Sequence, residues 1–110
     1  MRMWMVPPGV MCRSHLLGEH RELHALAGIL RKGISIDGYL RNGLVDTAQI
    51  GTRHTALVNE ITRRGYNHHS PLKVEVSVGR GTVDPKNSLE ELRNRCGDCK
   101  ERIDNAATDR

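Results

Sequence analysis

The sequence predicts an all-α fold, a compact single domain over residues 1–110 with three principal helices and irregular connections. Apolar residues recur at spacings of three and four along three segments, as one face of a helix requires. The chain has no Phe, one Trp and two Tyr, so its core must consist mainly of aliphatic side chains. A thin aliphatic core is covered more readily by amphipathic helices than by a sandwich of β-branched strands.

The first helix is predicted over residues 12–32. It is followed by Gly33, and its last turn contains Arg31 and Lys32, where cations stabilise the helix dipole. Its core face is formed by apolar residues that fall in one arc: Leu16, Leu23, Leu26, Ala27 and Leu30.

A second principal helix is predicted over residues 52–64, because Leu57, Val58 and Ile61 share one face and Gly65 follows. The connection over residues 34–51 holds three glycines, so we expect turns there, with a short helix near residues 36–41.

Alternation of Val74, Val76 and Val78 with polar residues predicts a strand or an extended segment, and the absence of a partner strand favours the extended segment. The third helix should begin at Asp84-Pro85 or at Ser88, where Ser88 and Glu91 match a capping box. Its apolar stripe is Leu89, Leu92, Cys96, Cys99 and Ile103. We expect the polar tail over residues 104–110 to be frayed.

The net charge is +4, and 13 of the 17 basic residues are Arg. Arginine suits an anionic partner because its planar guanidinium binds phosphate oxygens bidentately, although a merely basic, soluble surface is the simpler interpretation. Three cysteines and no apolar run at the start predict a protein of a reducing cytoplasm, without a membrane partner.

One group of polar residues on the first helix stands out. His15, Glu19 and Glu22 lie within about 60° of one another and overlap the edge of the leucine arc. Two partly buried carboxylates are typical of acid/base catalysis. They are equally compatible with an exposed flank or with pairing to arginines on a neighbouring helix.

The run from His15 to Leu23, HLLGEHREL, with Gly28 and the later run from Arg63 to Asn67, RRGYN, resembles the pyrimidine-dimer DNA glycosylases of the phage endonuclease V type. The similarity covers roughly residues 1–33 and 53–67. It implies a DNA repair enzyme of a bacterial or phage-host cytoplasm. The implied activity is that of a glycosylase with AP lyase activity on damaged double-stranded DNA containing pyrimidine dimers or abasic sites. The arginine and the catalytic glutamate of that family match Arg21 and Glu22.

The nucleophile of that family is the α-amine of the chain, and a gapless alignment from Glu22 places Met1 at that position. The resemblance therefore implies that the Met1 amine forms a Schiff base, with Met1 retained because Arg2 is large. An α-amine has a reference pKa of about 7.7–8.0, so an appreciable neutral fraction exists near pH 7. His15 and Glu19 are expected to support Met1 and Glu22.

Three departures from the family put lesion specificity in doubt. A further arginine of the family is Ala25 here, the middle segment is shorter, and the aromatic-rich tail is missing. Lyase activity on abasic sites needs only the amine, the carboxylate and contacts that bind DNA. These losses should therefore affect it less than they affect the recognition of pyrimidine dimers.

The motif Cys96-Gly97-Asp98-Cys99 could be half of a zinc site completed by His68-His69 or His54. Because both cysteines fall on an apolar stripe, buried thiols are the simpler interpretation, and we expect no metal and no cofactor. His54 is equally explained by packing on its own helix.

The predicted partner is damaged duplex DNA, bound by a monomer. The alternative is a non-catalytic DNA-binding protein on the same scaffold, with or without a cysteine-based zinc site. The predicted DNA contacts are basic residues near the proposed nucleophile or on later segments: Arg2, Arg13, Arg21, Arg53, Arg63, Arg64 and Lys73.

Overall fold

The computed structural model describes residues 1–68, 70–72, 74 and 78–108. It confirms the all-α class: the described residues contain helices and no strand. The α-helices are α1 (Arg13–Arg31), α2 (Asp37–Arg41), α3 (Ile50–Arg63), α4 (Pro85–Arg95) and α5 (Gly97–Thr108). Two short 3₁₀ helices, η1 (Pro8–Val10) and η2 (Thr47–Gln49), precede α1 and α3.

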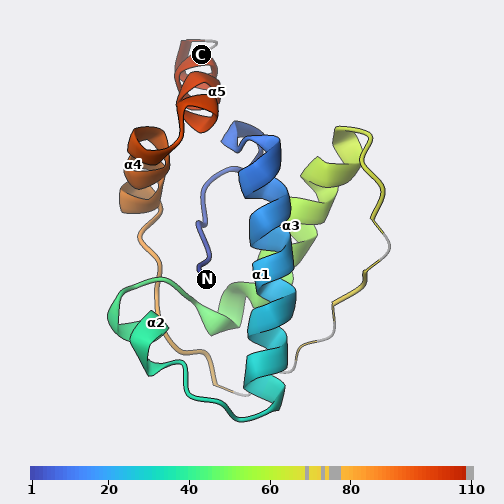
Figure 1. Cartoon of the computed structure of the whole chain (residues 1–110), viewed down its shortest axis with the longest axis vertical. Coiled ribbons are helices and arrows are strands. Elements are labelled where there is room, and N and C mark those ends of the chain that lie inside the picture. Colours follow the sequence, from blue (N-terminus) through green and yellow to red (C-terminus); the bar gives the residue numbers. More distant parts are fainter. Residues whose placement is uncertain (69, 73, 75–77, 109–110) are drawn as a thin grey trace.

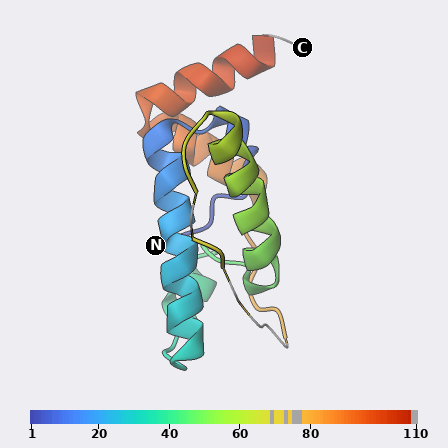
Figure 2. The ribbon, with the colours of Figure 1, turned by 90° about the vertical axis from the view of Figure 1, so that its right-hand side faces the viewer.

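Helices α1 and α3 lie side by side and form the centre of the molecule (Figure 1). Each buries the apolar face that the spacing predicted, including Leu16, Leu23 and Leu26 on α1 and Leu57 and Ile61 on α3. Figure 2 shows α5 lying across one end of this pair, where it contacts η1 and α4. The C-terminal helices therefore close one end of the core.

The predicted third helix is two helices, so the expectation of three principal helices was wrong. Cys96 has extended backbone angles, φ −131° and ψ 116°, which end α4 and turn the chain before Gly97 begins α5. Of the two predicted starts, Asp84 is the cap: its carboxylate accepts from the backbone N–H groups of Lys86 and Asn87. Helix α5 continues through Thr108, beyond the point where fraying was expected.

The N-terminal segment runs through the core beside α1 (Figure 1). Met3, Trp4 and Val6 are buried, and the backbone N–H of Met3 donates to the carbonyl of Leu44 at 2.7 Å. The sequence pattern gave no sign of the burial of Trp4 and Val6. Because its neighbours are anchored in this way, the chain start has a fixed position relative to α1.

The segment that leads into α4 crosses close to the loop before α3. Arg80 and Thr47 exchange two hydrogen bonds, Thr47 N–H to the Arg80 carbonyl at 3.0 Å and Arg80 N–H to Thr47 Oγ1 at 2.7 Å. At Gly81, which has a φ of +85°, a Cβ would lie 2.4 Å from the Val45 carbonyl oxygen, so only glycine fits. Of the extended segment expected over residues 74–78, positions 75–77 lie outside the described residues.

None of the helices in the described part of the chain has the length and apolar composition needed to cross a membrane.

Candidate active site and metal-ligand clusters

A cavity of about 440 Å³ opens beside the chain start. The backbone N–H of Arg2 donates to Glu22 Oε2 at 3.3 Å, which places the first residues of the chain against the carboxylate of α1. The cavity is lined by residues of the N-terminal segment, α1, the loop before α3, and α4: Met1, Arg2, Trp4, Ser14, His15, Gly18, Glu19, Glu22, Leu44, Glu91 and Arg95. Met1 and Glu22, which the sequence predicted as catalytic, therefore face one cavity.

The two carboxylates of α1 have different environments. The Glu19 side chain is 0% exposed, and Arg53 on α3 donates to it from Nε at 2.6 Å and from Nη2 at 2.9 Å. Arg53 also donates to the carbonyl of Val6 at 2.6 Å. Glu22 is only partly buried and borders the cavity. Glu19 is thus held by an ion pair inside the domain, while Glu22 remains accessible.

Arg53 was expected to contact phosphate, and the structure corrects this. The residue is 5% exposed, and its donors are directed at Glu19 and Val6 inside the domain. The helical spacing of residues along α3 shows on which face of the helix Arg53 lies. It does not show that a carboxylate of α1 lies opposite that face.

Arg64 was also expected to bind phosphate, yet its side chain is 10% exposed. It donates to Glu60 at 2.7 Å and to the carbonyl of Met11 at 2.7 Å, so it joins α3 to the segment before α1. The Arg63 hydrogen bond is the largest influence that lowers the pKa of Glu60, and Arg64 acts in the same direction against the opposing effect of burial. Arg64 is therefore a structural residue.

The Arg2 side chain is held by α4 rather than directed at solvent. It donates to Glu91 Oε2 at 2.6 Å and to Ser88 Oγ at 2.8 Å, and its guanidinium lies 3.8 Å from the centre of the Trp4 ring. Arg95 pairs with the same Glu91 and also lines the cavity. Sequence reasoning missed Glu91 and Arg95, because no local pattern shows that α4 forms a wall of the site.

Three other predicted DNA contacts remain on the surface. Arg13, Arg21 and Arg63 are exposed, and Arg21 directly precedes Glu22 on α1. The Arg13 guanidinium lies 5.3 Å from the ring centre of Tyr66. Lys73, the last predicted contact, lies outside the described residues.

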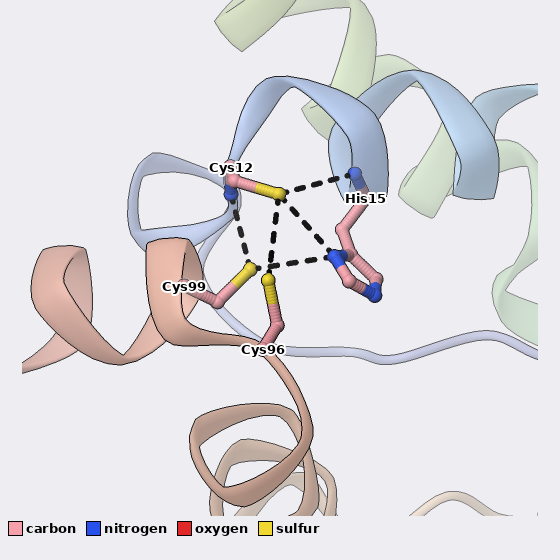
Figure 3. Close-up of side chains that lie close together, drawn as sticks. All are labelled: Cys12, His15, Cys96 and Cys99. Atoms are coloured by element: carbon pink, nitrogen blue, oxygen red, sulfur yellow. Dashed lines mark hydrogen bonds between the residues drawn. The ribbon is translucent and has the colours of Figure 1, made fainter.

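His15 lines the cavity but its ring also faces a cluster of sulfur atoms. Nδ1 lies 3.3 Å from Cys12 Sγ and 3.6 Å from Cys99 Sγ, and Cys12 Sγ lies 3.9 Å from Cys96 Sγ (Figure 3). The four residues come from the start of α1 and from the junction of α4 with α5. The histidines that the sequence suggested as partners of Cys96 and Cys99 are not in this cluster: His54 and His68 lie elsewhere, and His69 is outside the described residues.

A second group of four side chains with metal-ligand chemistry consists of His20, His24, His54 and His68. The rings of His20 and His24, one turn apart on α1, have centres 4.8 Å apart, and His54 of α3 lies 5.0 Å from His20. Burial, with the neighbouring histidines adding to it, lowers the pKa of His20 to about 4. Burial is also the main cause that lowers the pKa of His54. The histidine positions along α1 are visible in the sequence, but the convergence of α1, α3 and the following loop is not.

The family model of the pyrimidine dimer DNA glycosylases matches residues 1–74 of the 110-residue chain. The chain belongs to this family. No significant match was found among curated proteins or among solved structures. The matched segment contains Met1, Arg2 and Glu22, and membership implies action on damaged DNA. Glu91, Arg95 and two of the three clustered cysteines lie beyond the matched segment.

Proposed function

We propose that the protein is a DNA glycosylase with AP lyase activity, which acts on damaged double-stranded DNA through a Schiff base at the α-amine of Met1. The observation that carries the proposal is the 3.3 Å contact between the Arg2 backbone and Glu22 at an open cavity that Met1 also lines. A nucleophile and an acid/base group must share one accessible site, and Met1 and Glu22 both line this cavity.

The proposed reaction begins when the neutral amine of Met1 attacks the anomeric carbon of a damaged nucleotide. The bond from this carbon to the base breaks, and the base leaves with the electron pair. Glu22 stabilises the positive charge that develops on the sugar and accepts a proton from the attacking nitrogen. The sugar ring then opens to an imine between Met1 and the former anomeric carbon.

Strand cleavage follows from the imine. A proton is lost from the adjacent sugar carbon, the resulting electron pair forms a double bond, and the 3′ phosphate leaves. Glu22 lies close enough to the N-terminal backbone to accept this proton. At an abasic site the same reaction starts from the ring-opened aldehyde of the sugar. The Met1 amine condenses with this aldehyde, and water leaves as the imine forms.

The cavity agrees with a nucleotide ligand in size. Its volume of about 440 Å³ falls within the range of small-molecule sites, about 300–1,000 Å³. A nucleotide within duplex DNA reaches such a site only when it is flipped or the duplex is kinked. Arg21, exposed beside Glu22, is positioned to bind the flanking phosphates of the duplex.

The test is borohydride trapping on a duplex with one abasic site. Reduction of the imine should give a covalent protein–DNA adduct, and digestion followed by mass spectrometry should locate the adduct at the Met1 amine. The same preparation must show an N-terminal peptide that begins with unmodified Met1. A mobility shift without an adduct would instead indicate a non-catalytic DNA-binding protein, and an adduct at a lysine would overturn the role of Met1.

A parallel assay on a duplex containing a cyclobutane pyrimidine dimer tests the glycosylase step. Cleavage of the glycosidic bond of one dimer base is expected before strand cleavage, and it is detected as free base after photoreversal of the cyclobutane ring. If only the abasic duplex is cut, the lyase is retained and the glycosylase step is not.

A further inference from the structure

The geometry points to a structural Zn²⁺ site formed by Cys12, His15, Cys96 and Cys99. Their ligand atoms, three Sγ atoms and one imidazole nitrogen, all lie within 4.8 Å of one another (Figure 3). The sequence analysis expected no metal and interpreted Cys96 and Cys99 as buried thiols. That interpretation does not explain why a third cysteine and a histidine converge on the same point.

The spacing of the ligand atoms matches a tetrahedral site. With Zn–S bonds of about 2.3 Å and Zn–N bonds of about 2.0–2.1 Å, tetrahedral angles give sulfur–sulfur separations of about 3.8 Å and sulfur–nitrogen separations of about 3.5 Å. The Cys12–Cys96 sulfur pair is 3.9 Å apart, and His15 Nδ1 lies 3.3 Å and 3.6 Å from the sulfurs of Cys12 and Cys99. An ion at the centre would need only small shifts of these side chains.

Two short segments supply the ligands in pairs, and two residues separate the members of each pair. Cys12 and His15 lie at the start of α1, and Cys96 and Cys99 lie at the α4–α5 junction. Ligand pairs with this spacing are typical of structural zinc sites with three cysteines and one histidine. The extended backbone of Cys96, which divides α4 from α5, is what turns its sulfur toward the other three ligands.

Backbone N–H groups donate to two of the three sulfurs, as expected around zinc-bound thiolates. The N–H of Cys12 donates to Cys99 Sγ at 3.2 Å, and the N–H of His15 donates to Cys12 Sγ at 3.5 Å. These donors stabilise negative charge on sulfur.

Four protein ligands fill a tetrahedral zinc ion, so the site would have no open position for catalysis. Its effect is to fasten α5 and the end of α4 to the start of α1. The ion would stabilise the folded state because the unfolded chain does not hold the four ligands together.

A separate observation supports a second metal site. We infer that His20, His24, His54 and His68 bind a divalent transition metal, for which imidazole is a suitable ligand. Their ligand nitrogens lie within 4.8 Å of one another, and His20 Nε2 lies 3.0 Å from His68 Nε2. The Nε2 atoms of His24 and His54 are buried and have no hydrogen-bond partner among the described residues. A metal ion would satisfy buried nitrogens that otherwise destabilise the fold.

The two sites are tested together by metal analysis of the full-length protein reconstituted with Zn²⁺ under reducing conditions. Wild type should retain two equivalents of zinc after gel filtration. Cys99→Ser should lose the zinc of the cysteine site and His54→Ala that of the histidine site, so each variant is the matched control for the other. His15→Cys should keep the zinc of the cysteine site, because four thiolates also bind zinc.

Reconstitution with Co²⁺ identifies which equivalent has sulfur ligands. The intense cobalt–thiolate charge-transfer absorption should be present in wild type and His54→Ala and lost in Cys99→Ser. If Cys99→Ser does not fold, a thiol-specific mercurial added to wild type should release one zinc equivalent. A wild-type protein without thiolate absorption, or with a disulfide between two of the cysteines in place of metal, would overturn the first site. If wild type binds only one equivalent of zinc and His54→Ala retains it, the four-histidine site is overturned.

Discussion

The guanidinium of Arg53 and the carboxylate of Glu19 form a buried pair between α3 and α1, with side chains 5% and 0% exposed. Removing one partner of a buried pair leaves the other charge without compensation, which typically costs about 3–5 kcal/mol. We therefore expect Arg53→Ala and Glu19→Gln to lower the free energy of unfolding by a few kcal/mol, measured by urea denaturation. Glu19→Gln with unchanged stability but no cleavage would instead make Glu19 a catalytic residue.

Glu22→Gln should leave stability almost unchanged and reduce strand cleavage by at least about 100-fold, because it removes the acid/base group of the cavity. Affinity for an abasic duplex should be equal or higher, since a negative charge near phosphate is lost. Single-turnover cleavage and a binding titration on the same duplex measure the two effects. Loss of binding in step with cleavage would show that Glu22 acts on affinity and not on chemistry.

A single residue added before Met1 should reduce imine trapping by about 100-fold or more, because the amine moves by about 3.5 Å from its position beside Glu22. Acetylation of the amine should abolish trapping, since an amide nitrogen cannot form the imine. Circular dichroism should show unchanged helical content in both forms. Full trapping by the acetylated, folded protein would contradict the proposed nucleophile.

The salt dependence of DNA binding should distinguish surface arginines from structural ones. The logarithm of affinity should fall linearly with the logarithm of salt concentration, and Arg21→Ala should flatten the slope by about one unit if Arg21 contacts a phosphate. Arg64→Ala should leave the slope unchanged and lower stability, because its donors hold Glu60 and Met11. A flatter slope in a stable Arg64→Ala protein would return this residue to the DNA contacts.

Glu60 should make stability dependent on pH in the acid range. Its folded-state pKa is lowered, with the Arg63 hydrogen bond as the first cause, so its contribution is present above the unfolded pKa and is lost as pH falls through the folded pKa. The stability difference between wild type and Glu60→Gln should therefore be largest near neutral pH and shrink below about pH 4. Denaturation at several pH values measures it; a difference that grows with acid would contradict the assignment.

The helices could be predicted from sequence because each depends on local spacing. The apolar arc of α1 and the following Gly33 placed that helix within a residue of its observed bounds, Arg13–Arg31. The break at Cys96 was missed because the apolar stripe continues across it with helical spacing. A buried stripe shows which positions face the core but not whether the backbone is continuous between them.

The proposed catalytic residues, Met1 and Glu22, were predicted from a family resemblance, and the family match supports that resemblance. Local spacing and charge patterns alone would not have identified these two residues. Its surroundings depend on contacts between distant residues. Arg53 contacts Glu19 across 34 positions, and Cys12 contacts Cys99 across 87. The one local signal that was overlooked is that Cys12 and His15 have the same spacing as Cys96 and Cys99.

The contacts between α4 and the Arg2 side chain determine how far a functional fragment of the protein must extend. A fragment cut after residue 74 would contain the whole family match, including Met1 and Glu22. It would lack Ser88 and Glu91, which hold the Arg2 side chain at 2.8 Å and 2.6 Å. The chain start would then lose its side-chain contacts to α4, and the cavity would lose the wall formed by Glu91 and Arg95. Expression fragments and engineered variants should therefore extend through α5, because the contacts that position the proposed nucleophile reach beyond the segment by which the family is identified.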